Sequence, residues 1–485
     1  MKGDIVVKVY DKQFINGEWR VGTGKSKLSN YNPFSGELLY EYQSASAQDV
    51  DDACQAAAKA QKDWAKTPPS LKQAMLEKLI SVILEMKEDI YACLIEEGGS
   101  PLPKANFEFY TSIDIVKEAM SFPAHMEGKI LPSNIQGKEN YIFRVPKGVI
   151  GVITPWNVPI VLAMRSVVPA VATGNGVVLK PASDTPGSGF LIAEIFERAG
   201  FPKGLVNVVA GRGSEIGDAI VEHPIPALIS FTGSTEVGRR IGSVAGSMIK
   251  DVSLELGGNN AMIILKDADL VQAAKAAAFG AFFHQGQVCM ALNRIIVDAS
   301  VHDEFVDIFV KEVKHLPIGN PGTEGIFMGP IINRGQQVKI EKLVADTIAV
   351  GAKAALEGRT EGGLIYPWIL KEVANDMPAA VNEVFGPVCC IIKVKDEAEA
   401  IQLANETQYG LSGSVFTKDV FHGIKVARQI DSGMVHVNDQ SINDEPHVMF
   451  GGSKSSGVGR FNGKWVADKF TTEKWISVQA KDRAF

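Results

Sequence analysis

The amino-acid sequence predicts an α/β protein whose first part is a doubly wound, mostly parallel sheet. From Val149 onward, apolar runs alternate with helical segments, and continuous apolar runs of this kind suit strands buried on both faces. The chain has 485 residues, 46% of them hydrophobic and 22% charged, so it can bury a large core and form several domains. The runs that predict this sheet are VIGVITPW, GVVLKP, LVNVVAG, ALISFTG and AMIIL.

The segments before this sheet predict short strands followed by a block of helices. Residues 11–45 contain FINGEWRVG and SNYNPFSGELL, which are short strand-like pieces separated by Gly, Asn and Pro. From Ala47 to about Met120, Ala-rich and Lys/Glu-rich stretches have the spacing of amphipathic helices. The cluster from Gly98 to Pro101 ends one of these helices.

The segments after this sheet predict a second α/β domain and two strands that belong to neither domain. Between roughly Leu270 and Val437, the runs RIIVDAS, VCCIIKV and SGSVFT alternate with helical segments. GKENYIFRVPKGV, near residue 140, and the C-terminal KWISVQA have the pattern of edge strands. Unpaired edge strands commonly find partners in another subunit.

Charge and cysteine usage indicate a cytoplasmic protein without a nucleic-acid or membrane partner. The net charge of -7 gives no support for binding to anionic polymers or surfaces, and no apolar stretch is long enough to span a bilayer. The first fourteen residues carry charges throughout and do not form a secretory signal. Five scattered cysteines fit free thiols in a reducing compartment, and the eight histidines form no metal-binding pattern.

Cys289, in FFHQGQVCM, is the first candidate for chemistry. A cysteine in an apolar segment is more often a buried structural residue than a nucleophile. Cys289 differs from the other four because the polar, glycine-bearing QGQ directly precedes it. Those four lie in apolar or helical patterns and are predicted to be core residues: Cys54, Cys93, Cys389 and Cys390.

Two polar residues follow predicted strands, where ligands of parallel sheets bind. Glu255, in VSLELGGNN, precedes a Gly257-Gly258 turn and could act as a general base, although a solvated loop acid is the alternative. Asn157, in GVITPWNVP, stands at the start of a helical stretch. Its side-chain amide could donate to an oxyanion, or it could simply cap the helix.

Two further segments carry weak signals for a dinucleotide. FTGSTEVG, from Phe231 to Gly238, follows a strand and opens a helix, so its backbone amides would face a pyrophosphate. It lacks one glycine of the GxGxxG pattern. Lys180, in VVLKPASDTP, ends another strand and could reach ribose hydroxyls, or it could be a surface lysine before a turn.

Taken together, these segments resemble the aldehyde dehydrogenase superfamily along essentially the whole chain. The segments that carry the resemblance are, in order, TPWN, LKP, FTGSTEVG, LELGG, GQVC, EVFGP and FGGSKSSG. The resemblance implies a Rossmann-type dinucleotide-binding domain, an α/β catalytic domain and a small β oligomerisation arm. It places the first at residues 1–125 and 147–256, the second at 257–465 and the arm at 126–146 and 466–485, and implies a homodimer or homotetramer.

The resemblance also implies roles for individual residues. Cys289 would be the nucleophile, Asn157 the oxyanion-binding amide and Glu255 the base that activates water, so that an aldehyde is oxidised to a carboxylic acid. NAD would accept the hydride. The residues expected to bind it are Thr154, Trp156, Lys180, Ser183, Phe231, Gly233, Ser234, Val237, Leu256, Glu383 and Phe385.

Two departures from the family pattern bear on specificity. Many NAD-selective relatives carry a glutamate at the position of Ser183, where it would repel a 2′-phosphate. Ser183 removes that repulsion, so NADP is expected to be accepted alongside NAD. Met449 stands where relatives usually have a proline, and it would alter the rigidity of a loop near the substrate.

The stretch HVNDQSINDEPHVMFGGSKSSGVGRFNG resembles the branch of the family that oxidises vanillin, benzaldehyde and salicylaldehyde. Arg165 stands a little over two helical turns after Asn157 and is expected to make one wall of the substrate tunnel polar, with Asp444 or Glu445. An internal ion pair that never touches substrate is the alternative. The remaining residues expected to line the tunnel are Val161, Leu162, Phe283 and Phe450.

Other functions stay open from the sequence. A basic residue such as Arg165 could bind the distal carboxylate of a semialdehyde, and a broad-range aliphatic aldehyde dehydrogenase is a further alternative. An acylating relative that passes the thioester to coenzyme A would not need Glu255. A catalytically inactive structural protein would need none of Cys289, Glu255 and Asn157.

Overall fold

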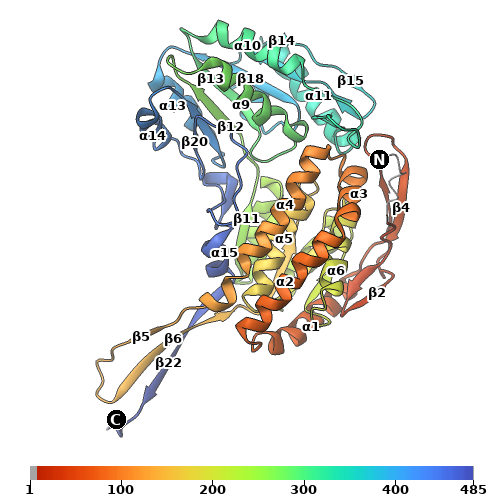
Figure 1. Ribbon diagram of the computed structural model, residues 1–485, viewed down its shortest axis with the longest axis vertical. Coiled ribbons are helices and arrows are strands. Elements are labelled where there is room, and N and C mark those ends of the chain that lie inside the picture. The colour runs from red at the N-terminus through yellow and green to blue at the C-terminus, as the bar shows by residue number, and fades with distance from the viewer. Residues whose placement is uncertain (1–7, 484–485) are drawn as a thin grey trace.

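The computed structural model describes residues 8–483 and confirms an α/β fold with two large sheets. Figure 1 shows these sheets in a lower and an upper lobe, with a third, narrow sheet extending away from the lower lobe. Residues 1–7 of the expected dinucleotide-binding domain and residues 484–485 of the expected arm lie outside the described residues.

The first sheet has a parallel centre and antiparallel edges, in the order β2-β1-β9-β8-β7-β10-β11-β21. The order of β9, β8, β7, β10 and β11 confirms the doubly wound arrangement, and every residue of β7 and β8 is buried. The strands are β1 (Gln13–Ile15), β2 (Glu18–Arg20), β7 (Val149–Ile153), β8 (Gly176–Lys180), β9 (Val206–Val208), β10 (Pro226–Thr232), β11 (Asp251–Glu255) and β21 (Gly457–Val458).

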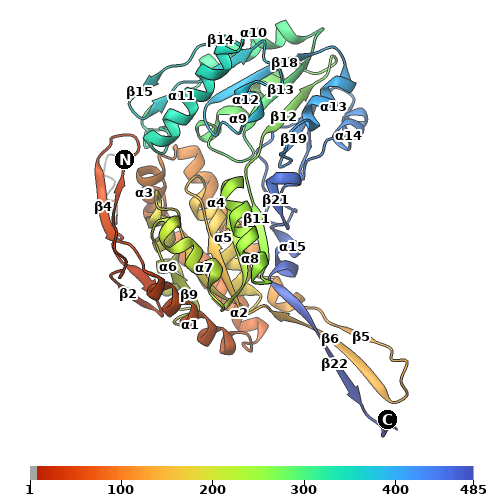
Figure 2. The ribbon, with the colours of Figure 1, turned by 180° about the vertical axis from the view of Figure 1, so that it is seen from behind.

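Helices cover both faces of this sheet, which explains why its central strands are apolar throughout. Helices α2 to α5 lie on the side facing the viewer in Figure 1, and α7 and α8 lie on the side seen in Figure 2. The expected helical block is confirmed, and Gly99 ends α3 in the left-handed conformation with φ of 60°. The helices are α1 (Ala47–Trp64), α2 (Pro69–Glu85), α3 (Lys87–Gly98), α4 (Leu102–Ala119), α5 (Pro159–Ala172), α6 (Pro186–Arg198), α7 (Asp218–Glu222) and α8 (Thr235–Ser247).

The second sheet, in the upper lobe, has the order β14-β17-β18-β13-β12-β19-β20 and confirms a second α/β unit. Cys389 and Cys390 are buried in β18, and Cys54 and Cys93 are buried as well, as expected of core residues. The strands are β12 (Asn260–Ile264), β13 (Leu292–Asp298), β14 (Lys353–Leu356), β17 (Trp368–Lys371), β18 (Val388–Val394), β19 (Gly413–Phe416) and β20 (His436–Val437). The helices are α9 (Leu270–Phe282), α10 (His302–Lys314), α11 (Arg334–Ala349), α12 (Pro378–Val381), α13 (Glu397–Asn405) and α14 (Val420–Ala427).

The third sheet joins the two segments that fitted neither domain. Strand β22 (Thr471–Gln479) pairs along its full length with β6 (Lys138–Pro146), and β5 (Lys129–Leu131) pairs with the other edge of β6. Figures 1 and 2 show this sheet as an arm that projects from the lower lobe. Short two-stranded sheets complete the fold: β3 (Lys27–Tyr31) with β4 (Leu38–Gln43), and β15 (Thr360–Glu361) with β16 (Leu364–Ile365).

The chain returns to the first sheet earlier than the expected range 257–465 for the second domain implies. Strand β21 pairs antiparallel with β11, and the following helix α15 (Gly463–Lys469) packs on α5. The approach is close, because a Cβ at Gly457 would lie 2.5 Å from the Leu254 carbonyl oxygen. Only a glycine fits there.

None of the helices within residues 8–483 is long and apolar enough to cross a membrane.

Candidate active site

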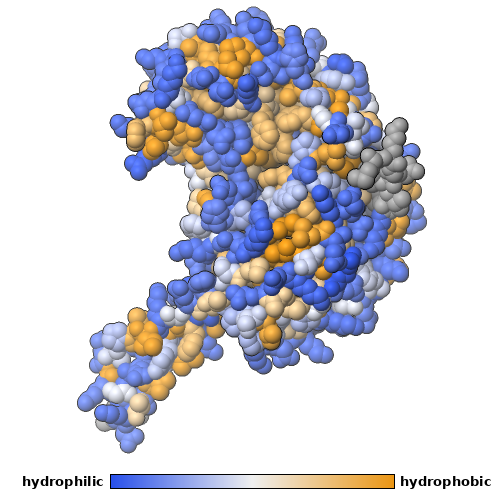
Figure 3. All heavy atoms as spheres, viewed as in Figure 1, coloured by the Kyte–Doolittle hydropathy of each residue, from blue (hydrophilic) through white to orange (hydrophobic). Residues whose placement is uncertain are grey.

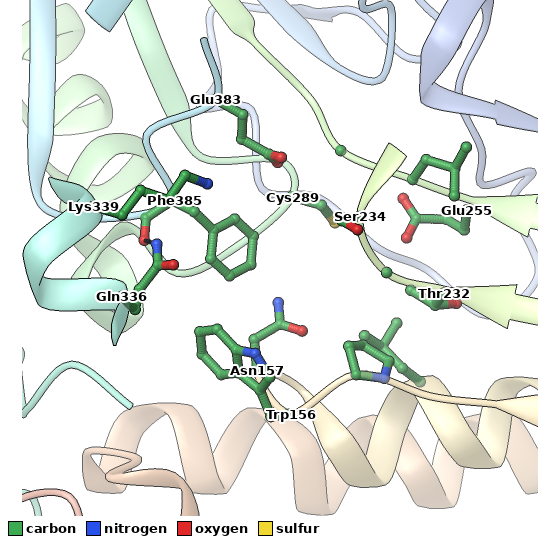
Figure 4. Close-up of a pocket in the computed structure, with 15 residues that line it drawn as sticks. Trp156, Asn157, Thr232, Ser234, Glu255, Cys289, Gln336, Lys339, Glu383 and Phe385 are labelled. Carbon is green, nitrogen blue, oxygen red and sulfur yellow. Dashed lines mark hydrogen bonds between the residues drawn. The ribbon is translucent and has the colours of Figure 1, made fainter. Parts of the chain in front are cut away.

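The carboxyl ends of the first sheet face the second sheet across a cavity of about 170 Å³. In Figure 4 the Asn157 amide lies on one side of this cavity and Cys289 on the opposite side, with Glu255 to the right and Glu383 and Phe385 to the left. The residues that line it are Pro155, Trp156, Asn157, Leu162, Thr232, Gly233, Ser234, Glu255, Leu256, Gly257, Cys289, Gln336, Lys339, Glu383 and Phe385.

The loop that carries Cys289 has an unusual backbone. Three consecutive residues of the 3₁₀ turn Phe283–Gly286 are left-handed: His284 with φ of 50°, Gln285 with φ of 58° and Gly286 with φ of 69°. Non-glycine residues adopt this conformation at a cost of about 1–3 kcal/mol each. A Cβ at Gly286 would lie 2.3 Å from the Gly386 carbonyl oxygen, so this position needs glycine.

Hydrogen bonds from elsewhere in the chain hold this loop in place. Gln285 Nε2 donates to the Pro330 carbonyl at 2.9 Å, and Gln287 Oε1 accepts from the Ile332 N–H at 3.0 Å. Asn260 Nδ2 donates to the carbonyl of Cys289 itself at 2.8 Å. The polar QGQ segment therefore has a structural purpose, which is to fix the position of the half-buried Cys289.

Asn157 points into the cavity and does not cap a helix. The N-cap of α5 is Val158, and no side chain of the N-cap residue bonds to the helix. The Asn157 side chain is buried, and its Nδ2 donates to the Gln287 carbonyl at 2.9 Å. Because an amide carries two N–H groups and this bond uses one of them, the other could donate to an oxyanion near Cys289.

Glu255 is the last residue of β11 and is buried, so the alternative of a solvated loop acid is wrong. Neither carboxyl oxygen has a hydrogen-bond partner of normal geometry within residues 8–483. Burial raises the pKa of Glu255 to about 8, while the Arg165 guanidinium and the nearby Cys289 thiol lower it to a smaller extent. A carboxyl with a pKa near neutrality is suited to accept a proton from water.

Burial and the neighbouring Glu255 carboxylate also raise the pKa of the Cys289 thiol well above its usual value, and Arg165 opposes them. The glycines after Glu255 bring the two groups together. A Cβ at Gly258 would lie 2.4 Å from the Cys289 carbonyl oxygen, and one at Gly257 would lie 2.3 Å from a Glu383 carboxyl oxygen. The turn that was expected to approach a ligand closely therefore approaches both the Cys289 loop and Glu383.

The expected dinucleotide segment forms a strand followed by a helix, as predicted. Strand β10 ends at Thr232, Gly233 follows, and Ser234 caps α8 by accepting a hydrogen bond from the Val237 N–H. A Cβ at Gly233 would lie 2.5 Å from the Phe231 ring, which explains the glycine. The exposed first turn of α8 thus presents backbone N–H groups to the groove, as a pyrophosphate requires.

Glu383 and two aromatic rings form the opposite side of the groove. Glu383 Oε1 accepts from the Gly258 N–H at 2.9 Å, and burial raises the pKa of Glu383 to about 7. The Phe385 and Trp156 rings are nearly perpendicular, with centroids 5.4 Å apart. Helix α11 adds Gln336 and Lys339, which the sequence did not single out because a polar helix face gives no signal of its own.

Five other residues expected to contact the cofactor do not line the cavity. Lys180 is buried, so the alternative of a surface lysine is wrong; its Nζ donates to the Pro181 carbonyl at 3.0 Å, and burial lowers its pKa to about 8. Ser183 is half-buried in the loop after β8. Thr154 and Phe231 are buried, and Val237 is exposed on α8.

On the substrate side, Arg165 pairs with Asp444 and not with Glu445. The pair is buried, Asn462 Nδ2 also donates to Asp444 at 2.8 Å, and the Arg165 guanidinium lies 4.0 Å from the centroid of the Phe450 ring. Asp444 and Phe450 also line a second cavity of about 400 Å³, together with Met449.

The apolar residues expected in the tunnel are divided between cavity and core. Leu162 lines the catalytic cavity, whereas Val161 is buried and donates its N–H to Glu108 at 3.2 Å. Phe283 is buried among aromatic rings, with centroid distances of 4.8 Å to Phe279 and 6.5 Å to Phe107.

Within residues 8–483, no group of three or more His, Cys, Asp and Glu side chains is arranged to hold a metal ion. The cavity instead brings together a thiol, a buried amide donor and a carboxyl of raised pKa, next to a groove with the features of a nucleotide site. This combination suits addition of a thiolate to a carbonyl, followed by attack of activated water.

Comparison with known proteins agrees with this geometry. The family model described as "Aldehyde dehydrogenase family" matches residues 19–476. A vanillin dehydrogenase of Corynebacterium glutamicum is 50% identical over 96% of this chain and 97% of its own length, and a benzaldehyde dehydrogenase of Bacillus subtilis is 48% identical over 98% of both. The crystal structure of an NAD-dependent benzaldehyde dehydrogenase from Corynebacterium glutamicum superposes with a TM-score of 0.89 at 46% identity, covering 99% of this chain and 97% of that one. The chain belongs to the aldehyde dehydrogenase family.

Proposed function

We propose that this enzyme oxidises aromatic aldehydes of the benzaldehyde and vanillin type to carboxylic acids, with NAD as the hydride acceptor. The observation that carries the proposal is the meeting of Cys289, Asn157 and Glu255 around one cavity that opens into the groove beside α8. The relatives named above support the aromatic substrate and NAD.

The proposed reaction uses each of the three residues once. The Cys289 thiolate adds to the aldehyde carbon and gives a tetrahedral thiohemiacetal. The second Nδ2 hydrogen of Asn157, with the Cys289 backbone N–H, stabilises the negative oxygen. After oxidation to the thioester, Glu255 takes a proton from water, which attacks the thioester and releases the acid.

The groove fits NAD. The Gly258 N–H binds only one carboxyl oxygen of Glu383, so the other oxygen can accept a hydrogen bond from a ribose hydroxyl. The first turn of α8 presents N–H groups for the pyrophosphate. Trp156 and Phe385 would confine the nicotinamide end near Cys289. When bound, NAD supplies the acceptor for the hydride. The remaining residues proposed to contact it are Thr154, Lys180, Ser183, Phe231, Val237 and Leu256.

NADP is proposed as a second cofactor. Ser183, in the half-buried loop after β8, places no acidic group of its own where a 2′-phosphate would lie.

For the substrate we propose that Leu162, which lines the catalytic cavity, contacts the ring and that Asp444, paired with Arg165, makes one wall polar. A semialdehyde with a distal carboxylate is the second candidate, because Arg165 is a buried cation with two donor nitrogens that have no hydrogen-bond partner within residues 8–483. Asp444→Asn should lower kcat/KM for vanillin more than for benzaldehyde or hexanal. Equal losses on all three would assign Asp444 to structure, and a preference for a carboxylate-bearing aldehyde would favour the second candidate.

We also propose that the first lobe binds the dinucleotide, the upper lobe carries the nucleophile and the arm joins two copies of the chain. The support for a dimer is the arm itself, because its outer strands β5 and β22 each have one edge that pairs with no other strand of the described residues. The five free cysteines support a cytoplasmic location.

One assay tests the central proposal. NADH formation is measured with benzaldehyde, vanillin and hexanal, with and without coenzyme A. Cys289→Ala should abolish turnover, and coenzyme A should change nothing because water is the acyl acceptor. Unchanged turnover by Cys289→Ala would refute the proposal, and a requirement for coenzyme A would replace it with acyl transfer.

A further inference from the structure

Arg165 is a buried cation, and only part of its guanidinium is hydrogen-bonded within residues 8–483. Its Nη2 donates to Asp444, and the Phe450 ring lies 4.0 Å from its guanidinium carbon. Nε and Nη1 are both buried and have no hydrogen-bond partner within the described residues. Since an unpaired buried donor costs free energy, this part of the guanidinium is suited to a neighbouring anionic or polar group.

Arg165 lies close to the reacting groups. It stands one turn after Leu162 on α5, and Leu162 lines the cavity together with Cys289 and Glu255. The loop that carries Asp444 also contacts the Cys289 loop, because Ser441 Oγ donates to the Met290 carbonyl at 2.6 Å. The Arg165 guanidinium acts on both Cys289 and Glu255 and opposes the effect of burial on their pKa values. The Asp444 carboxylate acts on Glu255 to a smaller extent. The positive member of the ion pair therefore acts on Cys289 and Glu255 more strongly than the negative member, and Asp444 also lines the second cavity.

Two further charged groups line this cavity, Glu383 and Lys339. Glu383, from the loop before β18, raises the pKa of both Cys289 and Glu255. Lys339, from α11, acts on Glu383 and lowers its pKa. The Glu383 carboxylate thus disfavours ionisation of both Cys289 and Glu255, and the positive charge of Arg165 opposes this effect.

We infer that Arg165 is the counter-charge of the Cys289–Glu255 pair, and that it allows this buried pair to carry one negative charge near neutral pH. Ionisation releases one proton to solvent, and the remaining charge lies on the Cys289 sulfur or on the Glu255 carboxylate. Two such close acids titrate as a unit, so a cation beside both lowers the pH at which the unit ionises. Asp444 and Phe450 are positioning residues that aim the guanidinium.

This inference rests on the proposed function in taking Cys289 as the nucleophile, but its test does not require turnover. The pH dependence of Cys289 alkylation by iodoacetamide reports the thiolate directly, because only the thiolate reacts. Wild type is compared with Arg165→Met, which keeps the length and removes the charge, and with Arg165→Lys, which keeps the charge.

Arg165→Met should raise the midpoint of alkylation by at least one pH unit, because removing a positive neighbour disfavours the anion. Alkylation at pH 7 should then be at least tenfold slower. The plateau rate at high pH should stay within about twofold of wild type, which separates ionisation from access to the thiol. Arg165→Lys should restore at least part of the shift.

Phe461→Leu is the matched control, because Phe461 also lies over the guanidinium, at 5.9 Å, and its replacement changes packing without changing charge. Its midpoint should equal that of wild type. A midpoint in Arg165→Met that equals wild type would overturn the inference, and so would an equal shift in Phe461→Leu. Loss of aldehyde oxidation in Cys289→Ala bears on the proposed function alone, so the two can fail separately.

Discussion

At the scale of single residues, the burial of Glu255 decides the pH dependence of the reaction. The base must be ionised to take a proton from water, and burial raises the pKa of Glu255 to about 8. The rate of thioester hydrolysis should therefore rise about tenfold per pH unit below pH 8 and level off above it. The measurement is the pH profile of deacylation. Glu255→Gln is the control, and its rate should no longer show the tenfold rise per pH unit below pH 8. A profile already flat from pH 6 would contradict a base of raised pKa.

Ser183 carries a prediction about the cofactor. A glutamate at this position would place a negative charge where the 2′-phosphate of NADP is proposed to lie, so the two would repel each other. Ser183→Glu should lower kcat/KM for NADP at least tenfold and change kcat/KM for NAD by less than about threefold. Ser183→Gln is the control of similar size without charge. A wild-type preference for NAD above a hundredfold would contradict the proposed use of NADP.

At the scale of elements, the strands and their ends were predictable from the sequence. The apolar runs identified β7, β8, β10 and β12, and the rule that ligands bind at strand ends correctly singled out Glu255 and Asn157 as cavity residues. The continuous apolar runs identify these strands because helices cover both faces of the sheet, so that every residue of β7 and β8 is buried.

The contacts between distant elements were not predictable, because no local pattern encodes them. Gln336 and Lys339 reach the cavity from α11, and β21 joins the first sheet from beyond the second. The left-handed backbone at His284 and Gln285 is likewise set by bonds to residues far along the chain. Glutamine rarely adopts that conformation, and histidine adopts it more often but still in a small minority of cases, so local propensity does not predict it.

Helix α5 shows how such a distant contact positions the site. The helix has no side-chain cap of its own, and Glu108 of α4 instead accepts the N–H groups of Ile160 at 2.9 Å and Val161 at 3.2 Å. Lys104 donates to Glu108, and both side chains are fully buried. Since Asn157 directly precedes this helix, the buried ion pair supports the loop that carries the amide.

Removing Glu108 should therefore destabilise the fold strongly. Glu108→Leu leaves the Lys104 ammonium buried without its partner and frees two helix N–H groups, which together should cost about 3–5 kcal/mol. The double variant Glu108→Leu/Lys104→Met should lose less, because no unpaired charge remains. Urea unfolding measures both values. A double variant less stable than Glu108→Leu would show that Lys104 has a separate stabilising role.

At the scale of the whole molecule, the active site is a junction between the two lobes. The first sheet supplies Asn157, Glu255 and the α8 turn, and the upper lobe supplies Cys289 and Glu383. The chain crosses between the lobes after Glu255 and returns at β21, which pairs with the same strand, β11. Strand β11 thus ends with the proposed base, Glu255, at the point where the chain crosses to the lobe that carries the proposed nucleophile, Cys289.

One face of the arm exposes several apolar side chains along all three strands. Ile130, Tyr141 and Ile476 are paired across the three strands and so share a face, and alternation adds further residues to it. Figure 3 shows apolar atoms on the arm, and the exposed apolar members of this face are Ile130, Phe143, Ile476 and Val478. Lys474 and Glu139 belong to the same face by register. Exposed apolar patches of this kind mark protein interfaces.

If this face joins two copies of the chain, a charge within it should separate them. Ile130→Asp/Ile476→Asp places two carboxylates on the apolar face, and burying them at an interface would be costly, so the variant should sediment as a monomer. Ser477→Asp is the matched control, because Ser477 pairs with Asn140 on the opposite face of the same strand and its replacement should leave the assembly intact. Analytical ultracentrifugation at micromolar concentration measures both, and circular dichroism verifies that each variant is folded. A folded double variant that sediments as wild type, or a control that dissociates equally, would place the interface elsewhere. Because the arm lies apart from the cavity, the separated monomer should keep a Cys289 that iodoacetamide alkylates with the wild-type pH midpoint.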